Sequence, residues 1–197
     1  MRSRDLDKEL LVRQKAIESI VNEGLETFSM NKLARSCKVS VATLYIYYKD
    51  RDDLILSIAV DEGKRMGEAM LKGFDTNASF EAGLRLQWRN RCDYMLANPL
   101  VSIFFEQLRS SSYQAKFLES FKAIFHGPIR QFMENAVRNG EIQKMPLEVY
   151  WSVAFAPLYA LIRFHTEGQS VGGVPFEISE KVLWATFDLV IKALKIK

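Results

Sequence analysis

Three tyrosines within four residues, followed closely by two basic residues, form the most distinctive cluster of chemical groups in this sequence. The tyrosines are Tyr45, Tyr47 and Tyr48, and the basic residues are Lys49 and Arg51. Tyrosine combines an apolar ring with a hydroxyl that forms hydrogen bonds, and lysine and arginine neutralise phosphate groups. The cluster therefore predicts a surface that contacts phosphates. We expect Tyr47 and Tyr45 at this surface, with a core position as the alternative for Tyr45, and Tyr48 in the core.

Residue sets typical of catalysis or of metal binding are absent from the sequence. It contains two cysteines, Cys37 and Cys92, without a C-x-x-C spacing, and two histidines, His126 and His165. We recognise no Ser-His-Asp set, pair of carboxylates, phosphate-binding loop or zinc-ligand spacing. We therefore expect a protein that is not an enzyme and that uses no metal, cofactor or disulfide.

The basic surplus of the chain lies in its first quarter. Residues 1–51 contain ten Lys and Arg against seven Asp and Glu, whereas residues 52–197 contain 17 of each. This distribution favours an anionic partner that meets one end of the molecule, and an ordinary solvated surface is the alternative.

Neither a secretion signal nor a membrane span is expected. The first 11 residues are charged and lack the apolar stretch of a signal peptide. The longest uncharged stretch, residues 149–162, has 14 residues, and a membrane-spanning helix needs at least about 17. We expect a cytoplasmic protein without a membrane partner, and we expect residues 149–162 to form part of a buried helix.

The scarcity of turn-forming residues and the spacing of apolar residues predict an all-α fold. Only ten glycines and five prolines occur among 197 residues, and apolar residues recur every three or four positions, which is the helical period. A long helix after Ser112 should end at Asn139-Gly140, with a kink or a break at Gly127-Pro128. Further helices are expected over residues 10–25, 30–38, 41–48, 51–73, 80–97, 99–108, 147–166 and 176–194.

Two short helices joined by a tight turn are predicted just before the tyrosines. Ser29 and Ser40 each precede a short helical segment and are suitable N-caps, and Asp50 can cap the following helix. A turn of about three residues between the first two segments makes them a helix-turn-helix. Its small core would contain Leu33, Val39 and Leu44.

The segment from Gly24 to Leu54 resembles the TetR family of bacterial transcriptional repressors. The family pattern runs from a glycine through T/S-M-x-x-I/L-A to V-S-x-G-T-L-Y-x-Y-F-x-x-K. The sequence differs from it at four positions, where Lys38 and Ala42 replace common glycines and Tyr48 and Arg51 replace Phe and Lys. The matching residues are Gly24, Ser29, Met30, Leu33, Ala34, Val39, Ser40, Thr43, Leu44, Tyr45, Tyr47 and Leu54.

This resemblance implies that residues 1–50 form a helix-turn-helix domain that binds double-stranded DNA. By the same resemblance, four residues would contact the sugar-phosphate backbone and four others would lie nearest the bases. The backbone contacts would be Ser29, Thr43, Tyr47 and Arg51, and the base contacts Asn31, Val41, Ala42 and Tyr45. Val41 and Ala42 can meet a thymine methyl group but offer no hydrogen bond to a base, so base discrimination is expected to be modest or partly based on DNA shape.

Residues 51–197 are expected to form a larger helical domain for ligand binding and dimerisation. Its many bulky apolar groups suggest a pocket for a small apolar effector, and simple filling of the core is the alternative. The predicted lining consists of Met70, Trp88, Cys92, Phe104, Phe125, Trp151, Phe155 and Tyr159. The polar candidates for orienting an effector are Arg91, Gln107, His126, Arg163 and His165.

The last predicted helix carries two apolar rows, which suggests a homodimer. One row could close the core of its own chain, and the other could pack on a second copy. The rows are Val182, Thr186, Leu189 and Ala193, beside Leu183, Phe187, Val190 and Leu194. The combined prediction is a homodimeric repressor that an apolar molecule releases from a palindromic operator. The alternative is a helical ligand carrier or partner-binding protein that has lost DNA recognition.

Overall fold

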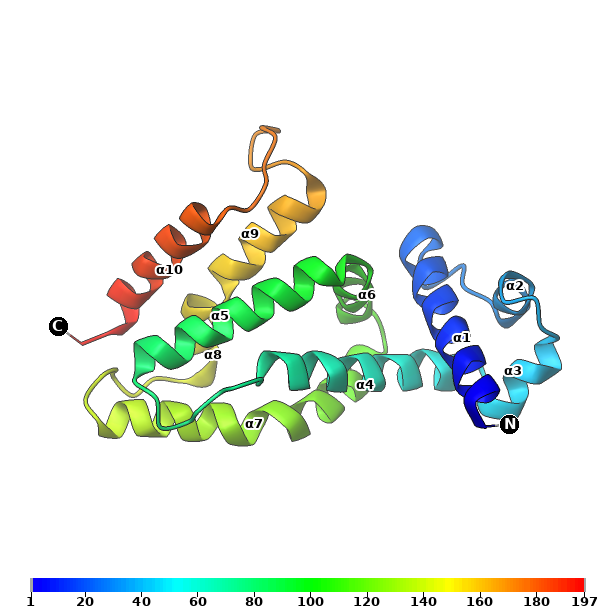
Figure 1. The fold of residues 1–197 in the computed structure, drawn as a ribbon, viewed down its shortest axis with the longest axis horizontal. Helices are drawn as coiled ribbons and strands as arrows, with labels where there is room; N and C mark the ends of the chain where they lie inside the picture. Colours follow the sequence, from blue (N-terminus) through cyan, green and yellow to red (C-terminus); the bar gives the residue numbers. More distant parts are fainter. Residues whose placement is uncertain (1, 197) are drawn as a thin grey trace. The chain divides into compact units, whose positions relative to one another are not determined.

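The structure of the protein is a computed structural model, which describes the backbone of residues 2–196 and the side chains of residues 8–119 and 127–196. Every regular element of this described backbone is an α-helix (Figure 1), so the predicted all-α class is confirmed. The helices are α1 (Arg2–Glu23), α2 (Met30–Ser36), α3 (Val41–Tyr47), α4 (Arg51–Met70), α5 (Phe80–Ala97), α6 (Pro99–Arg109), α7 (Gln114–Arg138), α8 (Leu147–Ala154), α9 (Ala156–Glu167) and α10 (Glu180–Leu194). None of the described helices is both long and apolar enough to cross a membrane.

The chain divides into two compact units. The first contains residues up to Arg65 together with Asn98–Lys122, and the second contains Met66–Ala97 and the chain after Lys122. Helix α6 therefore belongs to the same unit as α1, α2 and α3. The predicted boundary between residues 50 and 51 does not coincide with this division by packing.

In the first unit, one apolar core joins the three N-terminal helices to α4 and α6. Leu33 and Leu44 of the two short helices are buried, as predicted, and Val39 packs against them half-buried. Phe104 and Leu108 of α6 are fully buried in the same core, and Gln107 donates a hydrogen bond to the backbone oxygen of Val21 at 3.3 Å. Helix α6 is thereby fixed to α1.

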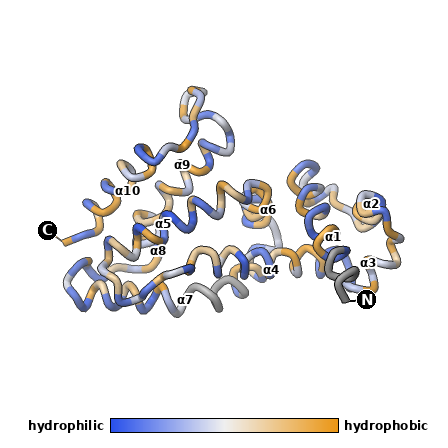
Figure 2. The backbone as a smooth tube through the Cα atoms, viewed as in Figure 1, coloured by the Kyte–Doolittle hydropathy of each residue, from blue (hydrophilic) through white to orange (hydrophobic). Residues whose placement is uncertain are grey.

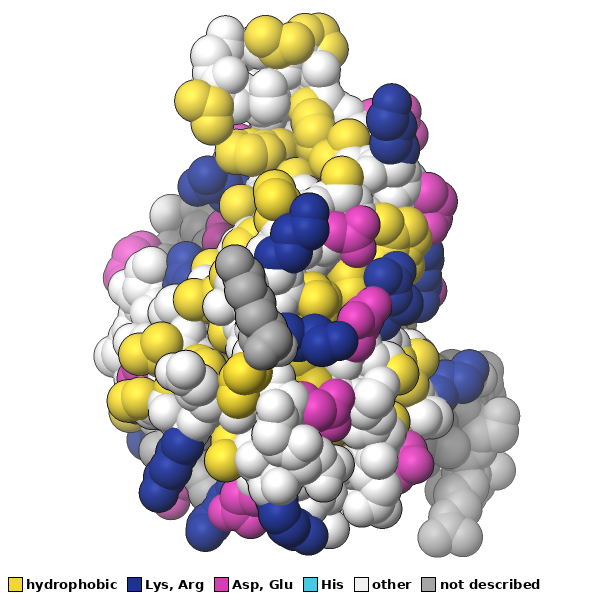
Figure 3. Space-filling view, turned by 90° about the vertical axis from the view of Figure 1, so that its left-hand side faces the viewer, with side chains coloured by type: hydrophobic (Ala, Val, Ile, Leu, Met, Phe, Trp, Pro, Cys, Tyr) yellow, Lys and Arg dark blue, Asp and Glu magenta, His cyan; other side chains and the backbone are white. Residues whose placement is uncertain are grey.

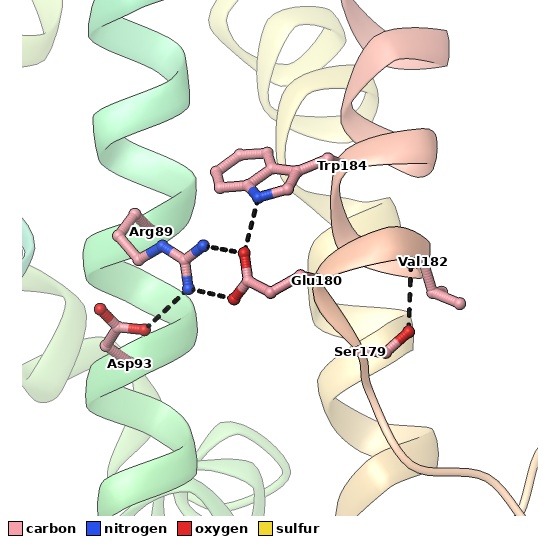
Figure 4. Close-up of polar contacts among 6 residues, drawn as sticks. All are labelled: Arg89, Asp93, Ser179, Glu180, Val182 and Trp184. Atoms are coloured by element: carbon pink, nitrogen blue, oxygen red, sulfur yellow. Dashed lines mark hydrogen bonds and ion pairs between the residues drawn. The ribbon is translucent and has the colours of Figure 1, made fainter.

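In the second unit, α5 packs against α9 and α10. The indole of Trp88, on α5, is fully buried, donates to the backbone oxygen of Ala154 at 2.7 Å and meets the ring of Phe187 edge-on at 5.3 Å. At the surface, Arg89 of α5 forms a two-pronged ion pair with Glu180 of α10, and Trp184 donates to the same carboxylate at 2.8 Å (Figure 4). The first turn of α10 is thus attached to α5.

The expected helix over residues 147–166 is wrong, because two helices occupy this stretch. Helix α8 ends at Ala154 and α9 begins at Ala156, with Phe155 between them at φ −125°. Pro157 lies in the first turn of α9, where it has no backbone N–H to continue the preceding helix. The expected burial of this stretch is incomplete, since Leu147 and Val149 in the first turn of α8 are 47% and 49% exposed.

By contrast, Gly127-Pro128 does not split α7, which runs without interruption from Gln114 to Arg138. Proline removes one backbone hydrogen bond from the ladder of a helix. In a helix of 25 residues, the buried side chains of Ile129 and Phe132 directly after it hold the next turn in place.

Helix α10 divides its two apolar rows as the sequence suggested. Figure 2 shows apolar segments recurring along α10. The row of Leu183, Phe187, Val190 and Leu194 is buried. In the other row, Val182 and Thr186 are half-buried, Ala193 is exposed and Leu189 is 66% exposed. Figure 3 shows hydrophobic side chains at the top of the molecule in that view. The α9–α10 connection carries the exposed Val171 and Val174.

Candidate nucleic-acid interface

Serine hydroxyls start both helices of the predicted helix-turn-helix. The Oγ atom of Ser29 accepts from the backbone N–H of Lys32 at 3.3 Å, and the Oγ atom of Ser40 accepts from that of Thr43 at 3.2 Å. The Ser40 and Thr43 hydroxyls also lie 2.8 Å apart. Each cap satisfies an N–H group that the first turn leaves without a helical partner. Both predicted caps are therefore confirmed.

The turn between α2 and α3 keeps its hydrogen bonds although it contains lysine where the family pattern has glycine. Lys38 adopts φ +55°, the left-handed region that favours glycine. Its backbone N–H donates to Arg35 at 3.1 Å, and that of Val39 donates to Ala34 at 3.0 Å. The turn geometry is thus closed in this chain despite the unfavourable backbone conformation at Lys38.

Helix α3 buries one side and exposes the other. Leu44 is 1% exposed and Tyr48, directly after the helix, is 8% exposed, as predicted. Tyr45 and Tyr47 are about half exposed, which favours the surface position for Tyr45 over the alternative in the core. Ile46, which the sequence reasoning did not single out, is 76% exposed. Its separation of four residues from Ala42 is the signal that could have found it, because residues four apart share a helix face.

The other predicted contacts lie on or beside these two helices. Asn31 on α2 and Ala42 on α3 are exposed, whereas Ser29, Val41 and Thr43 are half-buried. The exposed cations Arg35, Lys38 and Lys49 lie on α2 and in the segments that flank α3. The two helices therefore present small, hydroxyl-bearing and cationic groups together.

Arg51 differs from the other predicted phosphate contacts because its guanidinium already has a protein partner. It is half-buried, and its Nη2 atom donates to the backbone oxygen of Leu25. This bond connects the start of α4 to the segment that follows α1. The partner lies 26 residues away in sequence and is a backbone atom, so the sequence pattern could not predict this hydrogen bond.

Carboxylates fix the start of α4 as well. Asp50 accepts from the backbone N–H of Asp53 at 2.8 Å, and Asp53 accepts from that of Lys49 at 2.9 Å. The hydroxyl of Tyr113 donates to Asp52 at 2.6 Å. Burial of this tyrosine and its bond to Asp52 raise the pKa of Tyr113 to about 12, so the donating proton stays in place at neutral pH. The predicted cap at Asp50 is confirmed.

The predicted effector-lining residues fall into two groups. Phe104 belongs to the core of the first unit. Met70, Trp88 and Cys92 are buried in the second unit, where burial raises the pKa of the Cys92 thiol to about 11. Phe125 lies outside the residues whose side chains the structure describes.

Three of the predicted residues come together as an aromatic cluster, which we define as Trp151, Phe155 and Tyr159. The ring centroids of Trp151 and Phe155 lie 4.9 Å apart, and those of Trp151 and Tyr159 6.4 Å apart. The fully buried guanidinium of Arg91 lies over Phe155 at 4.2 Å and donates to the side-chain oxygen of Gln87. A buried cation thus borders the aromatic cluster.

The remaining polar candidates have structural partners or lie elsewhere. Gln107 bonds to α1, as described above, and the exposed Arg163 pairs with Glu167 at 3.9 Å. The Nδ1 atom of His165 accepts from the backbone N–H of Ile178 at 3.3 Å. The side chain of His126 lies outside the described part of the chain. Among the polar candidates whose side chains the structure describes, Arg91 lies over a ring of the aromatic cluster.

The helix-turn-helix region matches a known family. Residues 13–58 match the model of bacterial regulatory proteins, tetR family. A protein of Haemophilus influenzae, an HTH-type transcriptional regulator by its name, is 30% identical over 91 residues, which are 46% of this chain and 49% of that protein. The match thus spans about half the length of this curated relative.

The similarity to solved structures covers all or nearly all of the chain. A TetR family transcription regulator from Marinobacter aquaeolei VT8 has a TM-score of 0.86 at 22% identity, with 100% of both chains covered. A TetR-family transcriptional regulator from Haemophilus influenzae RD has a TM-score of 0.78 at 19% identity, with 98% of this chain and 99% of that chain covered. At such identities the likeness is one of fold.

Proposed function

Because the chain belongs to the tetR family of bacterial regulatory proteins, we propose that it is a DNA-binding transcriptional regulator. The observation that carries the proposal is the two-sided character of α3. Leu44 fixes the helix on the core, and Ala42, Tyr45 and Tyr47 are left at the surface. A recognition helix needs this division, because the buried side sets its orientation and the exposed side enters the major groove.

The proposed contacts divide into those that position the protein and those near the bases. Ser29, Thr43 and Tyr47 offer hydroxyls to phosphates, and Arg51 offers guanidinium N–H groups other than its buried Nε–H. Asn31, Val41, Ala42 and Tyr45 lie nearest the bases in this arrangement. The rigid start of α4 supports it, because Asp50 and Tyr113 hold the turn that carries Arg51.

The protein is proposed to act as a homodimeric repressor on a palindromic operator. Two copies related by a two-fold axis present two α3 helices to successive major grooves, about 34–36 Å apart. The partly exposed row of α10 supports such a dimer, and Leu147 and Val149 of α8 add exposed apolar area in the same unit. Helix α8 packs against α10, so both helices can contribute to one interface.

Release from DNA is proposed to follow the binding of a small apolar molecule at the aromatic cluster. The chain of contacts that supports this coupling runs from Phe155 to Arg91, and from Arg91 to Gln87. Gln87 then donates to the backbone oxygen of Met70, the last residue of α4, at 3.0 Å. A ligand that displaces Phe155 would therefore move the end of the helix whose first residue is Arg51.

The decisive experiment begins with selection of bound duplexes from a random DNA pool by the full chain. Fluorescence anisotropy at two salt concentrations then measures affinity for the selected duplex. Wild-type affinity should fall steeply with salt, because phosphate contacts release counterions. Tyr47→Ala should weaken binding about tenfold, since each subunit of the dimer loses a phosphate hydrogen bond.

The control variant is Val171→Ala, which truncates an 81% exposed residue in the second unit and should leave DNA affinity unchanged. A DNA affinity that changes neither with salt concentration nor with Tyr47→Ala would contradict the proposal. That result would favour the carrier or partner-binding alternative.

A further inference from the structure

The centre of the exposed face of α3 is apolar. Within α3, all of which the structure describes, Leu44 is the only buried residue. Each residue of an α-helix turns by about 100°, so Ala42 and Ile46 both lie about 200° from Leu44. These two residues therefore form the side opposite the core. Tyr45 lies on one edge of this side, and Thr43 and Tyr47 lie on the other.

Ile46 is larger than Ala42 and more exposed than either neighbouring tyrosine. It is 76% exposed, compared with 51% for Tyr45 and 49% for Tyr47. Single exposed apolar residues are common on protein surfaces. Here, however, the residue lies at the middle of the only side that α3 can offer to a partner, with Ala42 one turn before it.

The chemistry of the isoleucine side chain restricts what it can recognise in a DNA groove. It has no hydrogen-bond donor or acceptor, so it cannot bind a phosphate. In the major groove, adenine, guanine and cytosine present polar edges, and thymine adds an apolar C5 methyl group. Packing against a methyl group buries apolar surface favourably. Packing against a polar edge removes water from it without supplying a hydrogen bond, which is unfavourable.

We propose that Ile46 determines operator specificity by contacting the C5 methyl group of a thymine in each half-site, with Ala42 on the same face of α3. This inference rests on the proposed function, because it specifies the base that the same helix reads. It predicts an A·T pair in fixed orientation at the base step that faces the second turn of α3. Specificity at this step comes from attraction to the methyl group and from rejection of polar edges.

The test uses full-length wild-type protein and the duplex that it selects from the random pool. Each thymine is replaced in turn by deoxyuridine in both half-sites, which removes only the methyl group. Anisotropy should identify a thymine whose replacement weakens wild-type binding about fourfold per half-site, the effect of burying one methyl group. In Ile46→Ala, replacement of that same thymine should change Kd by less than about 1.5-fold.

Two controls keep the test specific. Ile46→Ala should fold as the wild type does, because Ile46 is largely exposed, and circular dichroism checks this. Leu118→Ala removes a 43% exposed leucine on α7 and should retain the full methyl effect.

Three results would overturn the inference. If wild type binds no duplex, the proposed function fails together with it. If the wild type binds with salt-dependent affinity but no replacement of thymine by deoxyuridine weakens binding, this inference alone fails. It also fails alone if the methyl effect persists undiminished in Ile46→Ala.

Discussion

At the scale of single residues, Lys38 shows how a locally unfavourable residue can be tolerated in the turn between α2 and α3. The backbone there requires φ +55°, which brings the Cβ atom of an L-residue too close to a neighbouring carbonyl oxygen. The hydrogen bonds of Lys38 and Val39 into α2 maintain the conformation nonetheless. The turn is thus determined by its surroundings more than by its own sequence.

Replacing Lys38 with glycine should stabilise the protein by about 1 kcal/mol, since glycine adopts this conformation without a Cβ clash. Urea denaturation followed by circular dichroism measures the free energy of unfolding. Lys38→Ala is the matched control, because it removes the charge but keeps the Cβ atom, and it should bring no comparable gain. Equal gains from both variants would attribute the effect to the charge and would contradict the backbone argument.

At the scale of helices, the contact between α5 and α7 depends on the absence of a side chain. A Cβ atom built on Gly83 would lie 2.4 Å from the Cε2 atom of Phe132. The Phe132 ring cannot easily withdraw, since it is 1% exposed and packs against the rings of Phe80 and Phe74 at 5.8 and 5.1 Å. Glycine at this position therefore sets how closely the two helices approach.

Gly83→Ala should destabilise the protein by about 1–3 kcal/mol through overpacking, although alanine is the better helix former. Gly127→Ala, within α7, provides the matched control. Its added Cβ atom would meet none of the described atoms within 4 Å, so this variant should gain up to about 1 kcal/mol from helix propensity. Urea titrations of both variants give the comparison, and a Gly83→Ala protein as stable as the wild type would contradict the packing argument.

Helix starts could be predicted from the sequence because a cap involves only a residue and the next few N–H groups. Ser29, Ser40 and Asp50 all cap as expected. The break at Phe155 was missed because the apolar pattern continues across it, although Pro157 was visible. A helix boundary inside a continuous apolar stretch depends on tertiary packing, which the periodicity of one segment does not contain.

The candidate surface on α3 was predictable in part, because helix geometry decides which side chains lie opposite the buried ones. Burial of Leu44 and Tyr48 was foreseen, and the opposite side of α3 follows from helix geometry. Ile46 was nevertheless overlooked, since an apolar residue type suggests the core. The partner of Arg51 is a backbone oxygen distant in sequence, and only the folded chain brings these two groups together.

At the scale of the whole molecule, the proposed regulator requires two copies, and the faces of α10 indicate where they would meet. The buried row from Leu183 to Leu194 closes the core of its own chain. The other row leaves Leu189 66% exposed, and the ion pair between Arg89 and Glu180 holds the first turn of the helix on α5. Helix α10 is therefore a supported element with an apolar side left for a partner.

Leu189→Glu should convert the proposed dimer into monomers without unfolding either chain. The substitution adds a charge to the apolar side of α10, and burying an unpaired carboxylate in an interface is strongly unfavourable. In the monomer the same side chain remains in water, so thermal stability at low concentration should change little. Sedimentation velocity measures the oligomeric state, and Leu118→Glu, the same change at a 43% exposed site on α7, should leave the dimer intact.

The Leu189→Glu variant should also bind DNA more weakly. Because both subunits of a dimer bind a palindromic operator together, operator affinity should decrease when the dimer is lost. A Leu189→Glu protein that still sediments as a dimer would show that the copies meet through a different surface.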